Sequence, residues 1–183
     1  MKNSSISSFI CLVVAVAISV SFSGCCAIPP RAKAYNIKLS LDESLYSSTV
    51  QVDLIGFNEG NLDRYESYPV STYFGDPDDS MRKLSYKKQF VFGQGQRMEQ
   101  VMLSTDPLWY TWLDQERASY LLVLVDLPGT FDDEESQTDP RRLIIPLRKC
   151  AWRGSWYRNI KTIDIIISEI NTYSLQDFKD ENL

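Results

Sequence analysis

The sequence of 183 residues contains no histidine. Histidine is the commonest general base near neutral pH and the commonest metal ligand, so catalysis would have to rely on carboxylates, lysine, tyrosine or serine. The chain also lacks a glycine-rich phosphate loop, a Gly-x-Ser-x-Gly elbow and a Cys-x-x-Cys pair. We therefore expect a protein that is not an enzyme and that uses no cofactor.

Acidic side chains are plentiful, but their spacing does not match a metal site. Residues 131–139 (FDDEESQTD) lack the alternating ligands and the turn glycine of an EF-hand loop. Asp76, Asp78 and Asp79 lie around Pro77, which is typical of a turn. We interpret both segments as solvated loops and predict no metal site. The net charge of −5 also argues against a nucleic-acid partner.

Residues 1–24 have the layout of a bacterial signal peptide. A positive charge at Lys2 precedes the apolar residues 9–22, a stretch shorter than the roughly 20 residues of a membrane-spanning helix. The tetrapeptide at 22–25 (FSGC) then resembles a lipobox, in which the peptidase cuts before the cysteine. This resemblance implies that Cys25 is acylated, for example with palmitate. The alternative is an ordinary secretory signal in which this cysteine has no role.

The residues after Cys25 bear on the location of the protein. Cys26 stands where many lipoproteins retained in the inner membrane have an acidic residue, so the same resemblance implies the outer membrane. Two or three acyl chains suffice for stable anchoring. Residues 25–34 contain two prolines and no apolar period, which predicts an extended tether. Cys26 and Cys150 are expected either to pair, to stay as free thiols or to form an intermolecular bond.

The pattern of residues 35–175 predicts one β-sandwich domain. Alternation at 35–41 and 50–55 predicts two half-buried strands, for which antiparallel pairing is the simplest arrangement. The continuously apolar residues 120–125 predict a central strand, and Pro146 favours an edge or a bulge for 143–147. Further strands are expected at 84–92, 98–103 and 160–170, and a helix is expected at 108–115.

These elements define the expected fold class. Seven or so strands, with long connections and one or two short helices, favour an all-β, antiparallel sandwich. Residues 58–83 carry scattered aromatic side chains and predict an excursion with a short helix. Residues 176–183 are charged and predict a disordered tail.

One group of side chains is typical of a protein-binding surface, because arginine and tryptophan carry much of the binding energy of interfaces. Its members are Arg141, Arg142, Trp152, Arg153 and Trp156. The alternative is that the tryptophans close one end of the sandwich and the arginines pair with the acidic loop. A second group of aromatic residues suits a concave site for a small ligand. It comprises Tyr65, Tyr68, Tyr73 and Phe74.

The whole layout carries a family resemblance. A lipoprotein signal, a proline-bearing tether, a small sandwich with a helical excursion, the pair Trp152-Arg153 and a last strand at 160–170 together resemble the TssJ-like outer-membrane lipoproteins of type VI secretion systems. The resemblance implies a transthyretin-like sandwich that holds a periplasmic partner of a membrane complex. Family members commonly have an extended loop between the first two strands, whereas residues 42–48 are short here. The alternative is a lipoprotein that binds a small molecule or a surface ligand.

Overall fold

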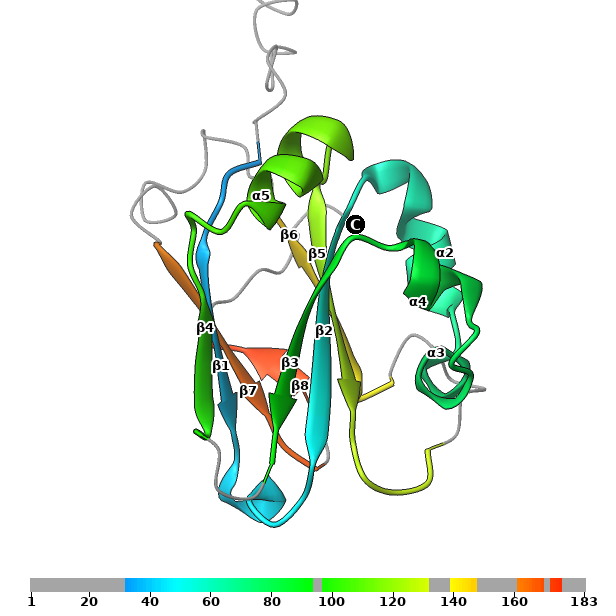
Figure 1. Ribbon diagram of the computed structural model, residues 1–183, viewed down its shortest axis with the longest axis vertical. Helices are drawn as coiled ribbons and strands as arrows, with labels where there is room; N and C mark the ends of the chain where they lie inside the picture. Colours follow the sequence, from blue (N-terminus) through cyan, green and yellow to red (C-terminus); the bar gives the residue numbers. More distant parts are fainter. Residues whose placement is uncertain (1–31, 94–96, 132–138, 148–160, 170–171, 176–183) are drawn as a thin grey trace, which may run out of the picture.

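The computed structural model describes residues 32–93, 97–131, 139–147, 161–169 and 172–175, which form two sheets packed face to face (Figure 1). In spatial order, the first sheet contains β4 (Glu99–Met102), β1 (Asn36–Leu41), β7 (Thr162–Ile167) and β8 (Thr172–Ser174). The second contains β3 (Lys87–Phe92), β2 (Val50–Phe57), β5 (Tyr120–Asp126) and β6 (Arg142–Pro146). Most pairs are antiparallel, so the expected all-β sandwich is confirmed.

The predicted pairing of the first two strands was wrong. β1 and β2 lie in different sheets, and the connection between them contains the short helix η1 (Glu43–Leu45). β1 instead pairs in parallel with β7, with Ile37 opposite Ile163, and antiparallel with β4. Alternation identifies a strand but not its neighbour, and the parallel neighbour of β1 comes near the end of the chain.

The predicted positions of two other strands are confirmed. β5 lies inside the second sheet, between β2 and β6, and β6 is an edge strand that contains Pro146. The end of the last predicted strand differs, because β7 stops at Ile167 and the separate strand β8 pairs back onto it. The expected tail at 176–183 lies outside the described residues.

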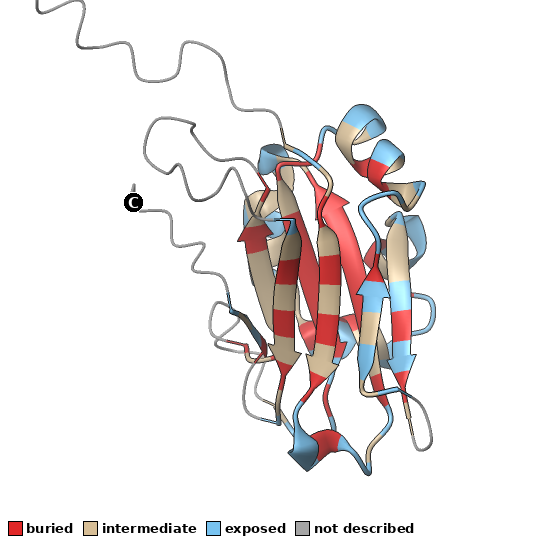
Figure 2. Cartoon of the chain, turned by 90° about the vertical axis from the view of Figure 1, so that its left-hand side faces the viewer, coloured by how far each residue is buried: buried red, intermediate tan, exposed pale blue. Residues whose placement is uncertain are grey.

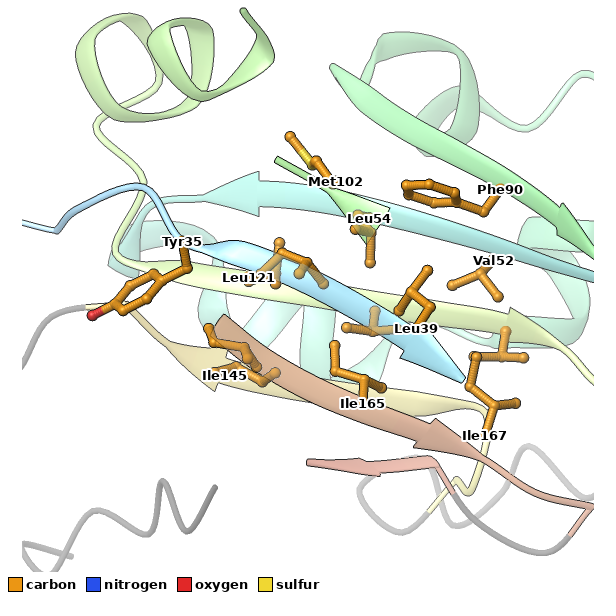
Figure 3. Packing of buried hydrophobic residues seen from close by; sticks show 14 of the residues in the cluster. Tyr35, Leu39, Val52, Leu54, Phe90, Met102, Leu121, Ile145, Ile165 and Ile167 are labelled. Carbon is orange, nitrogen blue, oxygen red and sulfur yellow. The ribbon is translucent and has the colours of Figure 1, made fainter. Parts of the chain in front are cut away.

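The main core lies between the sheets, where apolar side chains from both layers interdigitate (Figure 3). β1 and β7 bury alternate residues, as expected for strands with one face toward the core (Figure 2). Leu39, Leu54, Leu121 and Ile165 are each fully buried at this interface. Their removal from water is the main stabilising contribution to the sandwich.

Helices cover the outer face of the second sheet (Figure 1). Between β2 and β3 the chain forms η2 (Glu59–Asn61), α2 (Leu62–Ser67), α3 (Val70–Gly75) and α4 (Ser80–Leu84), where one short helix was expected. We call α2, α3 and α4 the helical layer. Because this layer lies on one face and the first sheet on the other, β2 and β5 are buried almost continuously.

The predicted helix at 108–115 is confirmed as α5 (Leu108–Tyr110) followed by the π-helix η3 (Thr111–Gln115). Trp109 and Trp112 meet at 86° with ring centroids 5.1 Å apart, and both are buried in the main core. Across the described ranges no helix is long and apolar enough to cross a bilayer.

Candidate functional site

The helical layer packs on the second sheet through an apolar cluster of its own. The sheet contributes Ile55, Phe57, Leu122 and Leu124, and the layer contributes Val70, Tyr73 and Met81. The Phe57 ring lies 4.5 Å from the Tyr65 ring and 5.4 Å from the Tyr120 ring, centroid to centroid. The layer is therefore a packed part of the domain.

The four aromatic residues predicted to line a ligand site take part in this packing. Tyr73 is fully buried, and its ring meets the Phe74 ring edge-on with centroids 4.9 Å apart. The Tyr68 hydroxyl donates a hydrogen bond to Asp79, which also caps the N-terminus of α4 by accepting from the Arg82 amide. These contacts use the side chains to hold the layer together, so they do not converge on one open site.

A buried carboxylate lies beneath the helical layer. Asp53 of β2 has no exposed surface and accepts hydrogen bonds from the Tyr73 hydroxyl (2.8 Å) and from Gln51 Nε2 (3.1 Å). Lys87 Nζ lies 3.9 Å from the Asp53 carboxylate. Burial, followed by the charge of Asp53, raises the pKa of Tyr73, so its hydroxyl stays protonated and keeps donating at neutral pH.

Sequence reasoning missed the role of Asp53. Alternation placed it on the face of β2 opposite Val52 and Leu54, and that is where it lies. The face was expected to be the polar one, but residues 62–84 cover it. The apolar Ile55 on the same face was the available signal that this side is also buried.

Of the predicted partner surface, Arg141 is buried. Its guanidinium donates two hydrogen bonds to the Asp139 carboxylate, at 2.9 and 2.7 Å, and lies over the Phe131 ring. Burial raises the pKa of Asp139, but hydrogen bonds from the Arg141 side chain and backbone outweigh it and hold that pKa below its usual value. This geometry matches the alternative in which an arginine pairs with the acidic loop.

Arg142 links two parts of the domain. Its guanidinium donates hydrogen bonds to the backbone carbonyls of Glu66 and Tyr68, which ties the edge strand β6 to the helical layer. The remaining members of the predicted partner surface, Trp152, Arg153 and Trp156, lie outside the described residues. So do Cys25, Cys26 and Cys150.

A pocket of about 170 Å³ opens between the helical layer, the end of β2 and Glu116, which follows η3. The apolar part of its lining includes Phe57, Tyr65 and Met81. The polar rim is held by hydrogen bonds, because the Asn58 side chain donates through Nδ2 to the Glu116 carbonyl and accepts through Oδ1 from Asn61 Nδ2. Among the described residues, no three His, Cys, Asp or Glu side chains are grouped as metal ligands would be.

Gly56 fixes how closely η3 approaches the sheet beside this pocket. A Cβ atom at position 56 would lie 2.4 Å from Trp112 Cγ, closer than side chains pack. The Trp112 indole nitrogen donates to the Tyr86 carbonyl at 2.7 Å. A glycine in β2 thus allows one tryptophan to pack on the sheet and to tie η3 to the residue before β3.

The fold therefore belongs to the class of two-sheet β-sandwiches, here with a helical layer on one sheet. No family model and no curated protein matches the sequence. The structure is similar to the solved C-terminal domain of the T6SS protein TssM from EAEC, with a TM-score of 0.50, 12% identity, and coverage of 77% of this chain and 99% of that chain. At this identity the similarity shows the fold alone.

Two further solved structures are similar at the same sequence identity. Serratia marcescens Lip, a membrane-bound component of the type VI secretion system, has a TM-score of 0.49 and 12% identity, with 79% of this chain and 98% of that chain covered. The T6SS lipoprotein TssJ1 from Pseudomonas aeruginosa has a TM-score of 0.46 and 12% identity, with 79% and 95% covered.

Proposed function

We propose that this chain is a lipid-anchored lipoprotein of the cell envelope, and that its sandwich is a structural or binding component of an envelope complex. The observation that carries the proposal is the N-terminal pattern of a charged start, an apolar stretch and FSGC at 22–25. Acyl chains on Cys25 would hold the domain on a membrane, which by the same resemblance is the outer membrane.

The finer proposal is that the complex resembles a type VI secretion membrane complex and that the chain is its outer-membrane anchor. The sequence layout supports this role. The TssM structure shares the fold, at a TM-score of 0.50 and 12% identity. The partner would be another envelope protein. We propose a structural rather than a catalytic role because the chain lacks histidine and the catalytic motifs considered above.

The small-ligand alternative has weaker support. Pockets for drug-sized ligands occupy roughly 300–1,000 Å³. The pocket beside η3, at about 170 Å³, is smaller. Its rim amides also hydrogen-bond to one another and to the backbone rather than pointing freely into the opening.

Adjacent cysteines provide a matched test of the anchor. We expect the wild-type and Cys26→Ser proteins to fractionate with membranes, with acyl mass on the N-terminal peptide in mass spectrometry. The Cys25→Ser protein should leave the membrane fraction and carry no acyl mass. Membrane retention of Cys25→Ser, together with an unmodified N-terminus in the wild type, would reject the proposal.

A further inference from the structure

The length of the tether limits how far one end of the domain can lie from the membrane. This inference rests on the proposed acylation of Cys25. Ala32, where the described structure begins, lies seven residue-to-residue steps after Cys25. Fully extended, these steps span at most about 25 Å, at 3.3–3.6 Å per residue. β2 alone, with eight residues, is about as long. The end of the sandwich next to Ala32 therefore stays within about 25 Å of the bilayer, whereas the opposite end can lie a further strand length away.

Several segments meet at this end (Figure 1). The start of β1 lies beside the residues after β4, because Asn36 Oδ1 accepts from the Ser104 amide at 2.8 Å. The chain then enters α5 and η3. The hydrogen bond between the Trp112 indole and the Tyr86 carbonyl places the junction of α4 and β3 against η3. Residues 84–86, residues 103–110 and Ala32 thus belong to one end of the domain.

This end carries a concentration of exposed apolar side chains. Among the described residues, four of the five most exposed large hydrophobic side chains lie here, with exposed fractions of 55–78%. We call them the end patch: Leu84, Tyr86, Leu103 and Tyr110. Grouped exposed apolar side chains mark surfaces that contact a partner or a membrane. Tyrosine is enriched where a protein meets lipid headgroups.

We propose that the end patch rests on the same bilayer that holds Cys25. Leu84 and Leu103 reach the boundary of the acyl chains, and Tyr86 and Tyr110 lie among the headgroups. Charges of both signs lie in the neighbouring segments, so binding needs no anionic lipid. Among the described residues they include Lys33, Lys88, Asp106, Asp114, Glu116, Arg117 and Lys161.

The contact has a consequence for assembly. A lipid chain alone would leave the domain free to rotate on its tether. A second contact through the end patch holds the strands at a steep angle to the plane of the bilayer. The opposite end, with the connection between β1 and β2, then faces away from the membrane. A partner reaching the protein from the aqueous side would meet that end first.

Hydroxyl-radical footprinting on the full lipidated protein tests the proposal. The purified protein in phosphatidylcholine vesicles is compared with the lipid-free Cys25→Ser protein in solution. We expect oxidation of Tyr86 and Tyr110 to slow several-fold on the vesicles. Oxidation of Tyr46, which is exposed at the opposite end, should not change.

Three results would overturn the inference. The first is equal oxidation of Tyr86 and Tyr110 on vesicles and in solution. The second is protection in native membranes but not in lipid vesicles, which would mean that a protein covers the patch. The third is protection of the lipid-free protein that disappears on dilution, which would mean that two copies of the chain pair through it.

Failure of the anchor itself gives a separate signal. The N-terminal peptide in the same digest shows whether Cys25 is acylated. If it is not, Cys25 is coupled to a maleimide phospholipid in the mature chain carrying Cys26→Ser and Cys150→Ser, and the footprint is repeated. Protection in that preparation supports the end patch even though the anchor proposal has failed, and its absence rejects both.

Discussion

The two faces of the second sheet are filled in different ways. On the inner face, Leu54 and its neighbours form an entirely apolar cluster with the first sheet. On the outer face, one residue earlier along β2, Asp53 is buried with a tyrosine hydroxyl as its partner. Hydrogen bonds are directional, so a buried carboxylate is satisfied in fewer arrangements than an apolar side chain. The main core thus stabilises the sandwich, and the polar contacts fix the position of the helical layer.

The largest effect should come from the inner face. We expect Leu54→Ala to lower the free energy of unfolding by about 2–5 kcal/mol, because it removes a fully buried side chain and leaves a cavity. Urea unfolding monitored by circular dichroism measures this loss. Val91→Ala, on the exposed side of the edge strand β3, is the control and should change stability much less. Equal losses would contradict the assignment of the core.

The outer face is tested by Tyr73→Phe. We expect a loss of about 1–3 kcal/mol, because the buried Asp53 carboxylate loses its closest donor. Amide hydrogen exchange should also rise in residues 58–86 more than in β1 and β7. Tyr46→Phe, at an exposed position, is the matched control. A uniform rise across both sheets would mean that the polar contact does not act on the layer in particular.

The pair of Arg141 and Asp139 predicts a pH dependence. The pKa of the Asp139 carboxyl is held below the ordinary 3.8, so the pair stabilises the folded state above that value. The stabilisation is lost as the pH falls through the folded-state pKa. Arg141→Met should therefore cost more stability at neutral than at strongly acidic pH in urea titrations. Lys83→Met, from the exposed pair with Asp78, should show little such difference. An equal loss of stability for Arg141→Met at both pH values would contradict the pH dependence expected from this pair.

The smallest effect concerns Gly75, and Gly56 provides a contrast to it. Gly75 ends α3, and a Cβ atom added there would have no atom within 4 Å, so Gly75→Ala should stabilise the layer by about 0.4–1 kcal/mol. Gly56→Ala should act in the opposite direction, because its Cβ would overlap Trp112. Thermal unfolding of both variants measures the contrast. A loss of stability in Gly75→Ala would show that the end of α3 needs glycine.

The two faces of the second sheet also show which features of the fold the sequence could predict. Alternation in residues 35–41 and the apolar run at 120–125 predicted strands that are present, because each pattern depends on nearby residues. Strand partners were not predictable in this way, since β1 pairs with β7 across most of the chain. The burial of Asp53 depends on a helix that follows it by about 20 residues.

The candidate surfaces show the same difference between features set by nearby residues and features set by distant contacts. Four aromatic residues of 58–83 were predicted to line a ligand site, because sequence could not distinguish packing against the sheet from the lining of a pocket. Arg141 was taken from a motif typical of interfaces, whereas its nearest acidic neighbour in the sequence, Asp139, is its partner. The end patch was not predicted at all, because its four residues come from two separate connections.

The central claim is that the protein is one component of an envelope complex. Crosslinking in native membranes, followed by recovery of this chain and mass spectrometry, tests it most directly. We predict that one large periplasmic or inner-membrane protein is recovered with the wild type and lost with Cys25→Ser. Recovery of no specific protein from intact membranes would contradict the claim and would favour a lipoprotein that binds a small molecule.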